Sequence, residues 1–232
     1  MKTPLLLAAL CCAPAGHAAA KELTANEFME NLSELLEQAP EPPPVSEARL
    51  VELEDGDPST YMFIRGAKAH PPEPVNLGGN GTLTLTRPDR MERATAAYRR
   101  ADGSYDGEEI KKIQRLMRSG GGGMETEVSV LLLEILDAVE DGFGGNGLTL
   151  LSGYRTPGHN RRVAGSARRS LHMLGWAADI RVPGRRPAEV ARFARRLRAG
   201  GVGCYTEAAF VHLDSGRRRY WQVPEPPPAR AK

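Results

Sequence analysis

The chain has 232 residues and a mass of 25.2 kDa, 41% of its residues are hydrophobic, and its 31 Lys and Arg nearly balance its 29 Asp and Glu. This length allows one domain with extensions or two small domains, and the hydrophobic fraction is sufficient for a buried core. Only the first dozen residues form a long uncharged apolar run, which excludes a multi-span membrane protein and a fully disordered chain.

The near-neutral total hides two regions of opposite charge. Residues 21–154 carry 13 Lys and Arg against 24 Asp and Glu, a net of −11, whereas residues 155–221 carry 15 Arg against four acidic residues, a net of +11. Such a division bears on partners rather than on fold. The basic region lacks the interleaved aromatic residues of a nucleic-acid binder, so we expect no nucleic-acid partner.

Residues 1–20 are typical of an export signal. Lys2 precedes an apolar stretch that is too short to cross a bilayer, and three alanines at 18–20 suit cleavage before Lys21. We therefore expect an exported, periplasmic protein with no transmembrane segment after cleavage. The mature chain would keep Cys204, at an ordinary core position, as its only cysteine, so its stability would come from the core or a metal rather than a disulfide.

Residues 21–80 are predicted to form an N-terminal extension. A capping box at Thr24 and Glu27 predicts a helix that runs to about Gln38. A Pro-rich linker follows at 42–44, and the segments 50–53 and 61–64 flank a turn and predict a hairpin. Residues 66–80, rich in Pro and Gly, are interpreted as a second linker.

Residues 81–223 are predicted to form an α+β domain, with a small antiparallel sheet and flanking helices. Alternating or short apolar segments predict strands at 81–87, 93–100, 148–151, 178–182, 210–214 and 219–223. Amphipathic periodicity predicts helices at 108–118, 126–141 and 187–199. Residues 224–232, which begin with a Pro-rich segment, are expected to form a disordered tail.

Three polar residues of the basic region stand in apolar surroundings. Asp179 and His212 each lie in a predicted buried strand, and His172 precedes Asp179 by seven residues, whereas His70 and His159 lie outside this pattern. A buried carboxylate needs a partner. Two imidazoles and one carboxylate would hold zinc with one position open for water, as hydrolytic sites do. From these residues alone the alternative stays open that Asp179 pairs with an arginine and the histidines are ordinary core residues.

Several motifs occur in an order that is similar to a known family. They are Ser152-Gly153-Tyr154-Arg155-Thr156-Pro157, Ser170-x-His172-x-x-Gly175-x-Ala177-x-Asp179-Ile180, Gly201-Val202-Gly203, Phe210-Val211-His212-x-Asp214-x-Gly216 and Tyr220-Trp221. In this order they resemble the YcbK/MepK-type murein endopeptidase family, within the wider group of zinc D-Ala-D-Ala carboxypeptidases and hedgehog-like peptidases. The resemblance is tight over 147–221, looser back to 82, and implies a hedgehog-like, D-Ala-D-Ala-peptidase-like fold.

The resemblance also implies roles for single residues. His172, Asp179 and His212 would bind one zinc ion. Arg155 would hold a substrate carboxylate or the developing oxyanion, with a structural pair to an acidic residue as the alternative. Ser170 would orient the site through a hydrogen bond.

The activity that the resemblance implies is that of a zinc metallopeptidase acting on the cell wall. It would hydrolyse amide bonds in peptidoglycan peptides, most simply as a DD-endopeptidase that cuts cross-links. A D-Ala-D-Ala carboxypeptidase is the alternative within the same class. A catalytically inactive relative that binds peptidoglycan is the alternative outside it.

The general base is left open by the sequence. In branches of the wider group a Glu three residues, or a His two residues, before the last metal histidine serves this role, but this chain has Ala209 and Phe210 there. Asp214 would project to the same side of a strand as His212, because side chains alternate, and is the first candidate. Glu207 on the preceding loop is the second. If Asp214 instead supports a histidine, its loss should weaken metal binding more than turnover.

Overall fold

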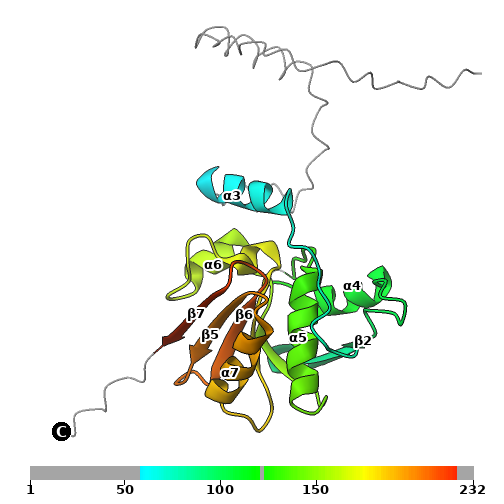
Figure 1. Cartoon of the computed structure of the whole chain (residues 1–232). Helices are drawn as coiled ribbons and strands as arrows, with labels where there is room; N and C mark the ends of the chain where they lie inside the picture. Colours follow the sequence, from blue (N-terminus) through cyan, green and yellow to red (C-terminus); the bar gives the residue numbers. More distant parts are fainter. Residues whose placement is uncertain (1–57, 121–122, 224–232) are drawn as a thin grey trace, which may run out of the picture. The chain divides into compact units, whose positions relative to one another are not determined.

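A seven-stranded sheet with the order β2-β1-β3-β4-β6-β5-β7 forms the centre of the protein, seen here in a computed structural model that describes residues 58–120 and 123–223 (Figure 1). The strands are β1 (Leu83–Arg87), β2 (Glu92–Ala96), β3 (Leu148–Ser152), β4 (Ala177–Arg181), β5 (Gly201–Tyr205), β6 (Phe210–Asp214) and β7 (Arg219–Val223). Neighbouring strands pair antiparallel except β1 with β3 and β5 with β7, which are parallel. The α+β class is confirmed, and the sheet is mixed rather than wholly antiparallel.

Helices lie on both faces of this sheet. They are α3 (Pro58–Lys68), α4 (Gly107–Leu116), α5 (Val130–Gly142), α6 (Pro157–Arg162) and α7 (Pro187–Leu197), with 3-10 turns η1 (Pro88–Arg90) and η2 (Leu171–Leu174). Helices α5 and α7 pack on one face, where the largest core cluster includes Ile180, Val211 and Leu213. Because strand side chains alternate, Asp179 and His212 point to the opposite face. The hydrophobic core therefore lies on one face of the strands, and the side chains of Asp179 and His212 lie on the other.

Most predicted elements occur close to their predicted bounds. Helix α5 begins four residues later than predicted, at Val130, because Ser129 caps it by accepting a hydrogen bond from the Leu132 N–H at 3.4 Å. The sequence did not predict α6, η2 or β5. Strand β5 begins Gly201-Val202-Gly203, and glycine is disfavoured in strand interiors unless another group approaches the backbone closely.

The predicted strand at 61–64 is wrong, because these residues lie in helix α3. A four-residue apolar run cannot distinguish a strand from part of a helix, and the contacts made elsewhere decide. Ile64, which is 3% exposed, packs with Met173 and Leu174 of η2, and Phe63 and Ala67 line the same cluster. Helix α3 thus supports the segment that carries His172.

We expect Ile64→Ala to loosen this packing. Removing a buried branched side chain costs about 2–4 kcal/mol in well-packed sites, and the neighbours here, Met173 and Leu174, directly follow His172 in η2. Amide hydrogen exchange should show lost protection across α3 and η2. The matched control is Met62→Ala on the exposed side of the same helix, where the side chain is 63% exposed and less than about 0.5 kcal/mol is expected. Equal loss of protection in the two variants would contradict this packing role.

Helix α5 buries three carboxylates, which accounts for part of the acidic front of the chain. Glu140 accepts hydrogen bonds from the backbone N–H groups of Thr84 (2.8 Å) and Gly147 (2.9 Å). Asp137 accepts from the Gly81 N–H and the Tyr98 hydroxyl, both at 2.8 Å, and Glu134 pairs with Arg99 at 2.5 Å. Burial raises the pKa of Asp137 and of Glu140. These acidic groups serve the fold and are not a surface for a basic partner.

Several predictions concern residues outside the described ranges. These are the export signal at 1–20, the helix to Gln38, the linker at 42–44, the first hairpin segment at 50–53 and the tail at 224–232. The domain boundary at residue 80 also stays a prediction, although α3 on its N-terminal side contributes to a buried cluster. None of the helices that the structure describes has the length and apolar character needed to cross a bilayer.

Candidate metal centre

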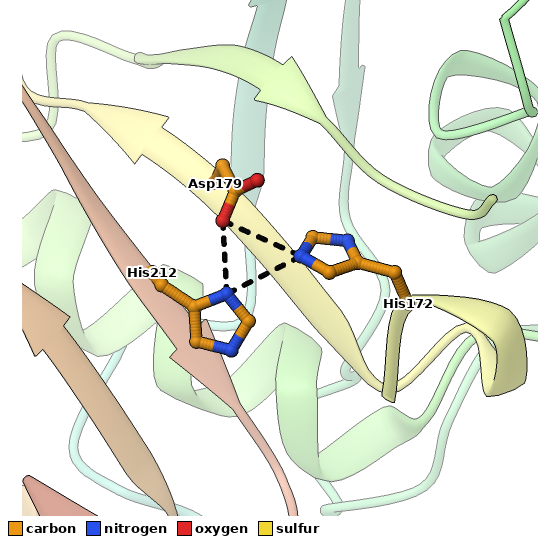
Figure 2. A group of neighbouring side chains, drawn as sticks. All are labelled: His172, Asp179 and His212. Atoms are coloured by element: carbon orange, nitrogen blue, oxygen red, sulfur yellow. Dashed lines mark hydrogen bonds and ion pairs between the residues drawn. The ribbon is translucent and has the colours of Figure 1, made fainter. Parts of the chain in front are cut away.

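The structure brings together the three residues that the sequence predicts as metal ligands. His172 comes from η2, Asp179 from β4 and His212 from β6, and Figure 2 shows their polar atoms converging. Asp179 Oδ1 lies 2.9 Å from His212 Nδ1 and 3.3 Å from His172 Nε2. The two imidazole nitrogens are 3.2 Å apart. Neighbouring strands place Asp179 and His212 directly opposite each other in the sheet register.

Two hydrogen bonds fix His172. Its backbone N–H donates to Ser170 Oγ at 3.4 Å, which caps η2, and its ring Nδ1 lies 2.7 Å from the Gly153 carbonyl oxygen. A carbonyl can only accept, so Nδ1 carries the proton and the Nε2 lone pair faces Asp179 and His212. Burial lowers the pKa of His172, which is 2% exposed, and so favours the neutral imidazole that binds metals.

His212 has the opposite tautomer. Its Nε2 lies 3.1 Å from Asp214 Oδ2, so this nitrogen donates to the carboxylate and Nδ1 faces the convergence point. Burial alone would lower the pKa of His212, but the bonds to Asp179 and Asp214 outweigh it and raise the pKa. A carboxylate behind a ligating imidazole is the arrangement that orients histidines at metal sites.

Asp179 is held from two sides. Its Oδ1 faces the two histidines, and its Oδ2 accepts a hydrogen bond from Arg155 Nη2 at 2.5 Å. Arg155 is itself fixed by a 2.8 Å hydrogen bond from Nε to Ser152 Oγ. Burial opposes ionisation of Asp179, yet the neighbouring imidazoles hold its pKa well below the usual range. The structural pair between Arg155 and an acidic residue, the alternative left open by the sequence, is thus present.

The donor set fits a metal ion. One ligand atom from each of His172, Asp179 and His212 lies within 4.8 Å of the others. Two neutral-nitrogen donors and one carboxylate oxygen suit zinc and leave a coordination position free. The other ring nitrogen of each imidazole and the second oxygen of Asp179 are already bonded elsewhere, as expected of ligands fixed in advance.

Asp214 lies behind His212 rather than in the open part of the site. Its side chain is fully buried and accepts hydrogen bonds from His212 Nε2, Arg219 Nη2 (2.7 Å) and the backbone N–H groups of Gly201 (3.2 Å) and Gly216 (2.9 Å). Both of its oxygens are therefore occupied. This geometry favours the supporting role for Asp214 over that of a general base. The sequence did not predict the contact of Arg219 with Asp214, because the pairing of β7 with β5 brings the two residues together.

Glycines in β5 allow side chains of β7 to reach the site. In the sheet register His212 lies opposite Gly203, and Gly203 opposite Trp221. The Trp221 ring packs over Gly203 to within 5.2 Å of the His212 ring centroid. A Cβ atom on Gly203 would lie 2.5 Å from Trp221 Cζ2, closer than real Cβ contacts. The same relation lets Arg219 cross Gly201 to Asp214, and this explains why glycine alternates in this strand.

A cleft of about 400 Å³ lies over the three converging residues. One set of lining residues comes from the segment 163–171, and another consists of Tyr205, Phe210 and Trp221 on β5, β6 and β7. Tyr205 and Phe210 stack with ring centroids 4.3 Å apart, and Trp221 Nε1 donates to the Tyr205 hydroxyl at 3.1 Å. Among the described residues that line this cleft, Asp179 is the only carboxylate.

The remaining residues singled out by the sequence lie elsewhere. Glu207 is exposed in the turn that joins β5 to β6. His159 lies in α6 with Nδ1 3.1 Å from Ser119 Oγ, His70 is exposed after α3, and Cys204 is buried in β5. None of these four residues lines the cleft. Ser119, which also accepts from the Thr156 N–H at 3.2 Å, thus connects α6 to the end of α4.

Comparisons with known proteins match the region of the chain that carries the cluster of His172, Asp179 and His212. A family model described as "Peptidoglycan L,D-endopeptidase MepK" matches residues 79–221. The proteins named peptidoglycan L,D-endopeptidase MepK from Escherichia coli K12 and Shigella flexneri are each 40% identical over 76 residues, which cover 31% of this chain and 42% of the relative. The Haemophilus influenzae protein, named a probable peptidoglycan L,D-endopeptidase MepK, is 29% identical over 146 residues, 60% of this chain and 78% of that protein.

The matched segment thus spans less than half the length of the Escherichia coli and Shigella relatives. No solved structure matches the chain significantly. The family model nevertheless covers more than half of the chain and includes strands β1 to β6, the first part of β7, and both histidines and the carboxylate of the cluster. The resemblance inferred from the motifs is confirmed, and the chain belongs to the MepK peptidoglycan L,D-endopeptidase family.

Proposed function

We propose that this protein is a zinc-dependent endopeptidase that hydrolyses amide bonds in the cross-links of peptidoglycan peptides. The observation that carries the proposal is the convergence of His172, Asp179 and His212 beneath a cleft, within the region that the family model matches. The N-terminal segment 1–20 supports export, so we place the activity in the periplasm.

Zinc would be held by His172 Nε2, Asp179 Oδ1 and His212 Nδ1. When bound, the ion supplies a Lewis acid for the scissile carbonyl and lowers the pKa of a water molecule towards neutrality. Arg155 fixes the ligand carboxylate through Nη2 and lines the cleft, where its remaining N–H groups can donate to charge that develops on the substrate oxygen. Asp214 and Arg219 hold the His212 ring in the tautomer that presents Nδ1.

The residues discussed so far leave the general base, the group that accepts a proton from the attacking water, without a candidate. Asp214 has both oxygens bonded, and Asp179 is a ligand candidate. We propose Glu207, the other carboxylate predicted from the sequence, as the group that accepts the proton of the attacking water. It is exposed in the turn two residues beyond Tyr205, a cleft residue, and no ion pair fixes it within the described part of the chain.

Asp214→Asn and Glu207→Gln separate support of the metal from proton transfer. Loss of a hydrogen-bond partner behind a metal ligand typically costs 10–100-fold in metal affinity, so Asp214→Asn should weaken zinc binding by about this factor. Glu207→Gln should leave zinc affinity unchanged and lower kcat by about 100-fold, a usual contribution of general base catalysis. Competition titration with a zinc chelator and steady-state kinetics measure the two effects. Full zinc affinity in Asp214→Asn would exclude its supporting role.

The test of the function is digestion of purified cross-linked muropeptides. Zinc-loaded protein is expected to convert dimers to monomers, and a chelator should stop this reaction. The names of the relatives favour an L,D bond, whereas the resemblance of the motifs implies a D,D bond, and mass spectrometry of the new ends distinguishes the two. Release of D-Ala from pentapeptides without dimer cleavage would identify a carboxypeptidase instead.

A peptidoglycan-binding module without activity is the second candidate. One observation favours it: Asp179 is the only carboxylate among the described residues that line the cleft. In that case the protein would bind isolated sacculi, and Glu207→Gln would change neither binding nor the absent turnover. Cleavage of dimers by the wild type would exclude this candidate.

A further inference from the structure

Arg169 lies at the cleft and has no partner among the residues that the structure describes. It is exposed, lines the cleft, and precedes His172 by three residues. Within residues 58–120 and 123–223, its guanidinium makes no hydrogen bond or ion pair. An arginine with five unused N–H donors beside a binding cleft can accept a planar anion such as a carboxylate in a bidentate manner.

The charge balance of the cleft singles out the same residue. Three arginines line the cleft. Arg155 is neutralised by Asp179 at 2.5 Å, and Arg219 by the buried carboxylate of Asp214 at 2.7 Å. Arg169 is the one whose charge is not balanced by the described residues. The cleft therefore carries an excess positive charge located on the segment 163–171.

The backbone on both sides of Arg169 is fixed before any ligand binds. Asn160 Nδ2 donates to the Ala167 carbonyl at 2.9 Å, and Ser166 Oγ donates to the Asn160 carbonyl at 2.6 Å. Ser170, the next residue, caps η2 through the His172 N–H. A charged group carried by a fixed backbone loses less entropy on binding than one carried by a flexible loop.

We propose that Arg169 is a specificity-determining residue that binds a free carboxylate of the substrate peptide. This inference rests on the proposed function and names the chemistry that the same cleft selects: an acidic peptide whose carboxylate lies near the scissile bond. The rings of Tyr205, Phe210 and Trp221 contribute an apolar surface to the cleft for the aliphatic parts of such a peptide. The combination favours an amphipathic, anionic ligand over a neutral one.

The test compares two muropeptides that differ only in whether the carboxylate nearest the scissile bond is free or amidated. Calorimetry on metal-free protein measures binding without cleavage, and kcat/KM is measured on zinc-loaded protein. Wild type should prefer the free acid by about tenfold in Kd, as expected for one charge-assisted contact. Arg169→Gln should bind the free acid as weakly as the amide and leave the amide unchanged. The effect on turnover should fall on KM rather than kcat.

Arg162→Gln is the matched control, because it removes the same charge from an exposed arginine on α6 that does not line the cleft. It should retain the wild-type preference. The inference is overturned if Arg169→Gln keeps the preference, or if both variants reduce it equally, since the effect would then be one of net charge. The binding ratio reports on Arg169 even if the zinc-loaded protein cuts neither peptide, and that outcome would contradict only the proposed function.

Discussion

Replacing His172 by alanine is expected to abolish stoichiometric zinc binding and, with it, cleavage of cross-linked muropeptides. His172 supplies one of three donors, and its Nε2 is the atom that the Gly153 hydrogen bond leaves free. Loss of an outer partner of a ligand costs up to about 100-fold in metal affinity, so loss of the ligand itself should cost more. Elemental analysis after dialysis and muropeptide digestion, run side by side, measure both effects.

His70→Ala is the control for this experiment. His70 is exposed after α3 and lies outside the cluster, so the variant should bind one zinc ion and cleave as the wild type does. Circular dichroism should show that both variants stay folded. Cleavage that continues in His172→Ala without bound metal would contradict the metal-dependent mechanism.

Gly203→Ala is expected to be strongly destabilising and to disturb the metal centre, although it adds only one methyl group. The new Cβ would overlap Trp221, which packs on the His212 ring, and strand pairing on both sides of β5 prevents the backbone from moving away. Overpacking a tight site costs about 1–3 kcal/mol and occasionally more. We expect a loss near the upper end of this range, a shift in Trp fluorescence and weaker zinc binding. Thermal denaturation, emission spectra and zinc titration test these expectations.

Gly107→Ala provides the comparison at an unconstrained position. A Cβ atom there meets nothing within 4 Å, and the residue begins helix α4. Alanine is expected to be neutral or to stabilise the protein by up to about 1 kcal/mol, because it restricts the unfolded chain. If Gly203→Ala were as stable as Gly107→Ala with unchanged zinc affinity, the contact of Trp221 with His212 would have no supporting role.

The sequence was sufficient to predict that His172, Asp179 and His212 lie together, but not which residues hold them in place. His172, Asp179 and His212 belong to a spaced motif, and an ionisable residue in an apolar strand predicts a partner. Their supports depend on tertiary contacts. The position of Arg219 beside Asp214 follows from the pairing of β7 with β5, which no local pattern predicts. The sequence also could not show that the Asp214 carboxylate accepts hydrogen bonds from His212, Arg219, Gly201 and Gly216, which is the reason for favouring a supporting role over that of a base.

The parts of the fold that sequence reasoning missed have related causes. Strand β5 contains glycines at 201 and 203, which lower strand propensity but are required by side chains that cross them. Helices α6 and η2 are one or two turns long, too short for a periodic signal. Helix α3 was misread because its apolar residues pack on η2, more than 100 positions away in sequence. In each case the deciding contact lies far along the chain.

The structure shows which contacts some charged residues of the acidic and basic regions make. Three carboxylates of α5 are buried as acceptors for backbone or side-chain donors, so the acidic front is partly internal. In the basic region, Arg155 and Arg219 pair with Asp179 and Asp214 at the candidate metal centre, whereas Arg169 pairs with no carboxylate among the described residues. Part of the charge asymmetry therefore supports the fold and the site, and Arg169 carries a charge that is available to a ligand.

The most direct test of the metal centre is a crystal structure of the zinc-loaded protein, with anomalous diffraction recorded at the zinc edge. We predict one zinc ion, bound by His172 Nε2, His212 Nδ1 and an oxygen of Asp179, with no fourth protein ligand and with Asp214 still bonded to His212 Nε2. Zinc bound at another site, zinc bound through His212 Nε2, or a fourth side chain closing the coordination sphere would contradict it.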